Sequence, residues 1–285
     1  SRGLGDVYKR QAANIGTRMK ELRRMDIKMV VMDWAGTTVD YGCFAPVHAF
    51  AKAFEEVGIT PTMQEIREPM GLLKMDHIRA MLSMKRIQRA WIAKYQQAPT
   101  VDDVERIYDI FEKQLLSGLV EYTDPKYGCL ECVQWLREQG IRIGSTTGYT
   151  HAMMDIVSVE ASKKGYEPDA LVTPEDVGDK GRPAPYMIFR NMQLLGIEDV
   201  RQVIKVGDTA SDMKEGKNAG VFTIGVLEGS SALGLSEEEF TSLSAEEKAE
   251  QMQRTQEKFT RAGADLVIWD LSELPEIIEK GVFII

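Results

Sequence analysis

The sequence predicts an α/β fold with a Rossmann-like parallel sheet core, helices on both faces of the sheet, and an inserted α-helical cap domain. Six short apolar runs, most of them rich in Val and Ile and bounded by Gly, Asp or Thr, are typical of buried strands. Amphipathic stretches such as THAMMDIVSVEASKKG and PAPYMIFRNMQLLG lie between them. Strands that alternate with helices form a parallel sheet covered on both faces. One interruption of this alternation, about a hundred residues of helical pattern, predicts the cap.

The predicted strands follow one another along the chain. They lie in MVVMDWAG near residue 29, IRIGSTTG near 141, ALVTPEDV near 170, VIKVGDT near 203, VFTIGV near 221 and DLVIWD near 265. The charged helical segment SEEEFTSLSAEEKAEQMQRTQEKFTRAG lies between the last two and is predicted to be a solvated surface element.

The helical interruption sets the expected domain boundaries. It contains FAPVHAFAKAFEEVG, LLKMDHIRAMLS, KRIQRAWIAKYQQ and TVDDVERIYDIFEKQLLSGL. An insertion just after the first strand lies over the carboxyl end of the sheet, where ligands bind in open α/β sheets. We therefore expect a cap domain at 43–122 and a core formed by 28–42 and 123–285. Residues 1–27 are expected to be an N-terminal extension, in part an artefact, that does not belong to the fold.

Composition limits the possible partners. The chain has 285 residues, 44% of them hydrophobic, and a net charge of -9, which disfavours nucleic acid and anionic membranes because both need a basic surface. An anionic small substrate would need a locally positive site. No apolar run is long enough to span a bilayer. Three cysteines without a secretory signal favour the cytoplasm, and the Cys129/Cys132 pair is interpreted as two ordinary helix residues because no second ligand pair for zinc lies near it.

Chemically active side chains gather at the predicted strand ends. Asp33 ends the first strand and is a candidate nucleophile, although an Asp there could also be a helix N-cap. Thr147 and Gly148 follow the second strand, where a hydroxyl and free N–H groups could hold phosphate oxygens. Asp208 and Asp212 follow the fourth, and carboxylates from two strand ends can share one Mg²⁺.

This ordered set resembles the haloacid dehalogenase superfamily after about residue 28. The resemblance implies that Asp33 is the nucleophile, that Thr147 binds phosphate, and that Arg182 takes the place of the usual Lys. It further implies that Mg²⁺ is held by Asp33, the backbone carbonyl of Ala35 and Asp208, with Asp212 in support.

Ala35 departs from the phosphatase pattern of that superfamily, in which a second Asp protonates the leaving oxygen. Either the leaving group needs no proton from this position, or the protein is weakly active or silent. A carbon leaving group next to a carbonyl would fit the first explanation, because an amine can form an iminium that accepts the electrons of the breaking P–C bond. Lys74 in PMGLLKMDH is the candidate amine, although most lysines are solvated surface residues.

The segments DWAGTTVDYGCFAP, PMGLLKMDHIRAM, GSTTGYT, GRPAPYM and KVGDTASDMKEGKNAG resemble the phosphonoacetaldehyde hydrolase family, the phosphonatases. The resemblance implies C–P bond hydrolysis in 2-aminoethylphosphonate degradation, a Schiff base on Lys74, and a site lined by Met70, His77, Cys43 and Tyr149. It also implies a homodimer formed through cap helices, although Trp91 and its neighbours could instead pack inside the cap. Two other functions stay open: a phosphomonoesterase or phosphomutase of the same fold, and a silent phospholigand-binding protein. His48 and His151 are given no role.

Overall fold

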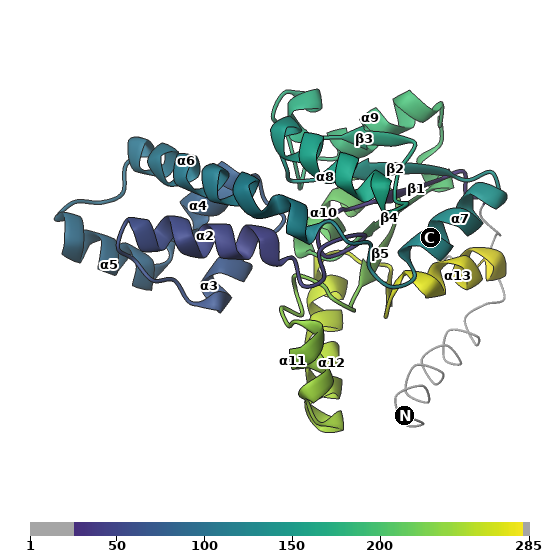
Figure 1. Ribbon diagram of the computed structural model, residues 1–285. Helices are drawn as coiled ribbons and strands as arrows, with labels where there is room; N and C mark the ends of the chain where they lie inside the picture. The colour runs from purple at the N-terminus through teal and green to yellow at the C-terminus, as the bar shows by residue number, and fades with distance from the viewer. Residues whose placement is uncertain (1–25, 282–285) are drawn as a thin grey trace.

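The computed structural model describes residues 26–281 of the chain (Figure 1). The extension predicted at 1–27 therefore lies almost wholly outside the described residues. Within the described part of the chain, no helix is both long enough and apolar enough to cross a membrane.

Six parallel strands form one sheet in the order β3-β2-β1-β4-β5-β6. All six predicted strands are present, and the predicted Rossmann-like α/β fold is confirmed. Their bounds are β1 Met29–Met32, β2 Arg142–Thr146, β3 Ala170–Val172, β4 Val203–Gly207, β5 Phe222–Val226 and β6 Leu266–Ile268.

Helices cover both faces of this sheet, so strand side chains that point in opposite directions are buried alike. In β1, Met29 and Val31 belong to the cluster that includes Ile188 of α9, whereas Val30 and Met32 belong to the cluster that includes Leu136 of α7. The helices that follow the strands are α7 Cys129–Glu138, α8 His151–Lys163, α9 Tyr186–Leu195, α10 Ala210–Ala219, α11 Glu237–Ser242, α12 Ala245–Ala262 and α13 Leu274–Lys280. Short 3-10 helices lie at Leu119–Tyr122, Pro174–Val177, Val200–Gln202 and Leu271–Glu273.

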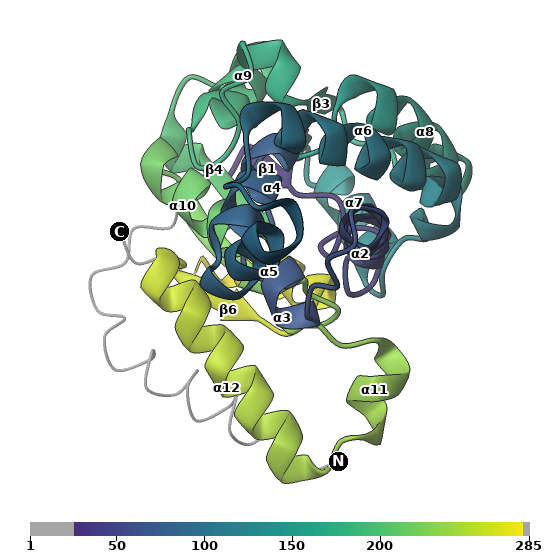
Figure 2. The same cartoon turned by 90° about the vertical axis from the view of Figure 1, so that its left-hand side faces the viewer.

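Helices α11 and α12 project from the rest of the molecule, as Figures 1 and 2 show. Ser236 and Ser244 begin them with capping boxes, which satisfy the free N–H groups of each first turn. Most of their side chains are exposed, which confirms the predicted solvated surface element.

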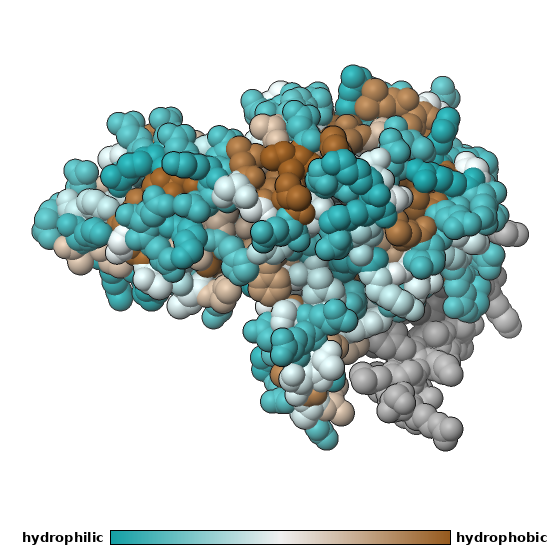
Figure 3. Space-filling view, viewed as in Figure 1, coloured by the Kyte–Doolittle hydropathy of each residue, from teal (hydrophilic) through white to brown (hydrophobic). Residues whose placement is uncertain are grey.

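A separate group of helices, which we call the helical lobe (residues 44–118), lies beyond one edge of the core (Figures 1 and 2). It comprises α2 Phe44–Glu56, α3 Met63–Arg67, α4 Lys74–Ser83, α5 Lys85–Tyr95 and α6 Val101–Gly118. Phe50, Phe54, Phe111 and Trp91 are fully buried in it, so Trp91 packs within the chain. Figure 3 shows hydrophobic surface where the lobe meets the core, among several hydrophobic patches on a largely hydrophilic face. The exact division into a core of 28–42 and 123–285 and a cap of 43–122 stays a prediction.

Candidate active site

Three buried carboxylates meet at the carboxyl edge of the sheet. Asp33 follows β1, Asp208 follows β4, and Asp212 lies in the first turn of α10; one oxygen from each lies within 4.8 Å of the others. The chain brings them together because β1 and β4 pair in parallel, with the Asp33 N–H donating to the Val206 carbonyl at 3.0 Å. Burial, followed by the charges of Asp33 and Asp212, raises the pKa of Asp208 well above its usual value. A hard divalent cation would relieve this repulsion, so the donor set fits a metal such as Mg²⁺.

A tight turn after Asp33 shapes one side of this carboxylate group. Gly36 has φ +86°, and a Cβ placed there would lie 2.7 Å from the Asp208 Cγ. Only glycine therefore allows both the left-handed backbone and the close approach to Asp208. Lys126 donates to the Gly36 carbonyl at 2.6 Å, and the Ser231 N–H donates to Asp208 at 2.7 Å. Ala35 lies in this turn, and the proposed contact of its carbonyl with a metal stays a prediction.

Arg182 places a buried positive charge among these carboxylates. Its Nη2 donates to Asp33 at 2.6 Å, and its Nη1 lies 3.1 Å from Asp212. Burial alone would raise the pKa of Asp212, but Arg182 and Lys205 outweigh it and hold that pKa below its usual value.

Lys205 and Glu215 complete this network, and sequence reasoning missed both. The Lys205 ammonium lies 2.9 Å from Asp212 and 3.1 Å from Glu215, and the same Glu215 oxygen lies 3.1 Å from Arg182 Nε. The signal was a charged residue inside the apolar run VIKVG, since a lysine is rarely buried without a partner. Four carboxylates, at 33, 208, 212 and 215, thus lie around the two cations at 182 and 205.

The predicted phosphate-binding residues lie in the loop after β2. Thr147 is buried, and its Oγ1 accepts a hydrogen bond from the Tyr149 N–H at 3.0 Å. Tyr149 also belongs to this loop, because Thr150 caps α8 and the helix starts at His151. The loop therefore extends to Tyr149 and leaves Gly148 at its tip.

Lys74 reaches this loop from the helical lobe. It is the first residue of α4 and only 7% exposed, and its Nζ would lie 3.9 Å from a Cβ placed on Gly148. The same nitrogen lies 5.0 Å from the centroid of the Tyr149 ring. Burial lowers the pKa of Lys74, and Arg182 contributes in the same direction, while Cys43 and Asp33 oppose the shift. A buried amine with a lowered pKa is the form of lysine that acts as a nucleophile.

His77 lies about one turn further along α4, three residues after Lys74. Its ring stacks on Phe50 with centroids 3.8 Å apart. Burial, with the adjacent charge of Lys74, lowers the pKa of His77 well below its usual value. The imidazole is therefore neutral near pH 7 and can accept a proton.

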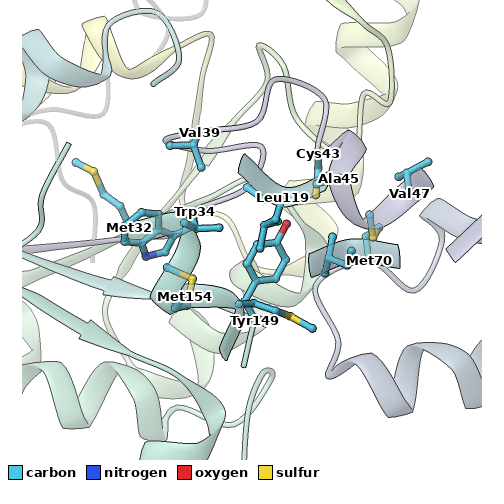
Figure 4. Packing of buried hydrophobic residues seen from close by; sticks show 14 of the residues in the cluster. Met32, Trp34, Val39, Cys43, Ala45, Val47, Met70, Leu119, Tyr149 and Met154 are labelled. Atoms are coloured by element: carbon cyan, nitrogen blue, oxygen red, sulfur yellow. The ribbon is translucent and has the colours of Figure 1, made fainter. Parts of the chain in front are cut away.

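Met70 and Cys43 line the same region from the lobe side. Both are buried, and Figure 4 shows Tyr149 with Cys43 and Met70 beyond it toward the lobe. Met70 does not share a helix with Lys74, because Gly71, at φ +87°, forms a turn before α4 begins. Met70 reaches the site through that turn instead.

The remaining candidates lie away from these residues. His48 is exposed and contacts the Tyr122 hydroxyl, while His151 lies on the surface beside Asp176. Cys129 and Cys132 are free and buried in α7, which confirms their interpretation as ordinary helix residues. Across residues 26–281, the carboxylates of 33, 208 and 212 form the one group of three or more such side chains with suitable metal-ligand spacing.

Comparison with known proteins agrees with this geometry. A family model of haloacid dehalogenase-like hydrolases matches residues 27–220. Phosphonoacetaldehyde hydrolase of Lysinibacillus sphaericus is 53% identical over 89% of this chain and 94% of its own length. The chain belongs to the phosphonoacetaldehyde hydrolase family. It is accordingly an enzyme of the haloacid dehalogenase-like hydrolases.

Two other relatives extend the comparison. A bifunctional phosphonoacetaldehyde hydrolase/aminoethylphosphonate transaminase of Clostridioides difficile is 49% identical over 92% of this chain and 41% of its own length. The crystal structure of a phosphonoacetaldehyde hydrolase-like protein from Oleispira antarctica superposes with a TM-score of 0.87 and 35% identity, over 92% of this chain and 95% of that one. Since these matches cover about nine-tenths of the chain, the family likeness includes the helical lobe that carries Lys74.

Proposed function

We propose that this enzyme hydrolyses the carbon–phosphorus bond of phosphonoacetaldehyde to give acetaldehyde and phosphate. The observation that carries the proposal is the position of Lys74, a buried amine with a lowered pKa beside the loop of Thr147 and Gly148. Ala35 supports it as well, because a carbon leaving group that departs as an enamine needs no acid at that position. The names of the relatives from L. sphaericus and C. difficile point to the same substrate.

The first proposed step forms an imine. The neutral Lys74 amine attacks the aldehyde carbon, and loss of water gives an iminium whose C=N bond is next to the carbon attached to phosphorus. Direct cleavage of the P–C bond would expel a strongly basic carbanion. With the iminium in place, the electron pair of the P–C bond forms a C=C bond, and the π pair of the C=N bond moves to nitrogen, which leaves a neutral enamine. His77, neutral near pH 7, is proposed to accept and return the protons of imine formation.

The second proposed step transfers phosphorus to Asp33. Arg182 holds the carboxylate of Asp33, so the attacking oxygen is oriented before substrate arrives. Attack forms an aspartyl-phosphate as the P–C bond breaks; water then releases phosphate, and the enamine is protonated and hydrolysed to acetaldehyde. Asp33, Asp208 and the Ala35 carbonyl would hold Mg²⁺, supported by Asp212, and the ion when bound would neutralise charge on the phosphonate oxygens.

The remaining parts of the proposal concern the setting of the reaction. Residues 43–122 are proposed to act as a cap that opens for substrate and excludes water when closed. The fused C. difficile relative, whose other activity is named as an aminoethylphosphonate transaminase, supports a place in 2-aminoethylphosphonate degradation. We further propose a cytoplasmic homodimer formed through the lobe helices.

Borohydride trapping tests this function. The enzyme is incubated with phosphonoacetaldehyde and Mg²⁺, reduced with borohydride, digested and mapped by mass spectrometry; we expect the reduced adduct on Lys74. Lys74→Arg is the control, because it keeps the positive charge but cannot form an imine, and we expect neither adduct nor turnover.

Three outcomes would overturn the proposal or its imine step. Phosphate release from simple phosphate esters, without adduct formation from phosphonoacetaldehyde, would favour a phosphomonoesterase or phosphomutase. No phosphate release from any phosphonate or ester with Mg²⁺ would favour a phospholigand-binding protein. Near-normal turnover of phosphonoacetaldehyde by Lys74→Arg would remove the imine from the mechanism.

A further inference from the structure

Arg67 connects the helical lobe to the core at a point close to the active site. It is the last residue of α3, seven positions before Lys74. Its Nη1 donates to the Gly42 carbonyl at 2.8 Å and, at 3.4 Å, to the carbonyl of Ser231. Its Cζ lies 4.8 Å from the centroid of the Phe44 ring. The guanidinium of this α3 residue thus contacts the start of α2 and the core loop after β5.

The core loop that Arg67 contacts also positions a predicted metal ligand. The Ser231 carbonyl accepts from Arg67, while the Ser231 N–H donates to the Asp208 carboxylate at 2.7 Å. Gly234 adjoins the same arginine, since a Cβ placed on it would lie 3.0 Å from the Arg67 Cδ. A single residue of the core therefore connects the arginine of the lobe to the carboxylate group beside Asp33.

Other contacts between residues 67–74 and the core are close but carry no charge pairing. A Cβ on Gly71 would lie 2.9 Å from the Ser211 Cβ, and a Cβ on Gly181 would lie 2.7 Å from a methyl group of Leu73. No salt bridge joins residues 44–118 to the rest of residues 26–281. Van der Waals contacts of this kind are weakly directional, whereas the planar guanidinium fixes direction through its hydrogen bonds.

We propose that Arg67 is a latch that holds the helical lobe closed and keeps Lys74 buried over Gly148, in register with Asp33 and Asp208. Asp33 and Lys74 are 5% and 7% exposed, as a closed lobe requires. Nε and Nη2 of Arg67 are buried and have no hydrogen-bond acceptor among the described residues, so the Nη1 contacts and the Phe44 ring carry the latch. Arg67 is thus a positioning residue, and its effect on turnover rests on the proposed role of Lys74.

The accessibility of Lys74 tests the latch without substrate. Wild type, Arg67→Met and Arg67→Lys are treated briefly with acetic anhydride, and acetylation of Lys74 is followed by peptide mass mapping. The matched control is Arg79→Met, which removes an exposed arginine of α4 that pairs with Asp76. Loss of hydrogen bonds from a charged donor should raise the equilibrium constant for opening of the lobe by about 10- to 100-fold. We therefore expect Lys74 in Arg67→Met to be acetylated about 10- to 100-fold faster than in wild type.

The other readouts separate a latch from a merely structural role. Arg67→Lys keeps the charge and one donor, and should give an intermediate Lys74 reactivity. Arg79→Met should match wild type. Should Arg67→Met fail to fold, the Arg67→Lys comparison decides, and wild-type Lys74 reactivity in every folded Arg67 variant would overturn the proposal. Failure of borohydride trapping in wild type would reject the imine mechanism and leave the acetylation result unaffected.

Discussion

Replacing Gly36 by alanine should weaken the metal site as well as the fold. The residue has φ +86°, a conformation that costs a residue with a Cβ about 1–2 kcal/mol. The new Cβ would lie 2.7 Å from the Asp208 Cγ and nearer still to its Oδ2. Carbon atoms normally approach to about 3.5–4.0 Å, so the Asp208 carboxylate must move by about 1 Å. A displacement of that size in a catalytic group costs about 100-fold in rate.

Gly140→Ala provides the matched control for this prediction. Gly140 has φ +70°, and a Cβ placed there meets nothing within 4 Å, so it carries the backbone strain without the contact. Both variants should lose about 1–2 kcal/mol of unfolding free energy in urea. Only Gly36→Ala should lose Mg²⁺ affinity, by about 10- to 100-fold in calorimetric titration, as changes around metal ligands usually do. Equal Mg²⁺ affinity in the two variants would refute the view that Gly36 shapes the Asp208 site.

Three further predictions concern charge and pH. His77→Gln should remove a loss of stability that wild type shows below pH 6.5. Because burial lowers the pKa of His77 in the folded protein, the unfolded chain binds more protons below pH 6.5. The unfolding free energy of wild type therefore falls by up to about 1.4 kcal/mol per pH unit as pH falls from 6.5 to the folded pKa. Urea unfolding of the two proteins between pH 5 and 7 measures this difference. Burial raises the pKa of Asp40 to about 7, but Asp40 is present in both proteins, so its contribution cancels in the difference. Lys205→Met should lower the unfolding free energy by about 3–5 kcal/mol, because it leaves Asp212 and Glu215 without one of their cations. The double variant Lys205→Met/Glu215→Gln should recover part of that loss. An unchanged urea midpoint in the single variant would contradict the network. Addition of Mg²⁺ at about 100 times its Kd should stabilise the metal-free protein by about 2.7 kcal/mol, whereas the same concentration of Na⁺ should not.

Strands, turns and the residue types at strand ends could be predicted from the sequence, because they depend on neighbouring residues. Valine-rich runs that end in Asp33 or Asp208 predicted strands with exposed carboxylates, since parallel strands place their carboxyl ends at one edge. The turn before Lys74 is likewise local, because Gly71 has no Cβ to oppose its φ of +87°. The missing acid at Ala35 selected the class of reaction to propose.

Partners that lie far apart in sequence were decided only by the tertiary structure. Arg182 lies 149 positions from Asp33, and Arg67 lies 164 from Ser231, yet each pair is within hydrogen-bond distance. Burial of Lys74, which lowers its pKa, likewise depends on how the lobe rests on the core. Periodicity and turn residues specify which side chains an element presents, because those features are local. The pairing of these charged side chains, and the extent of their burial, depend on the packing of the whole chain, because residues far apart in sequence form the contacts.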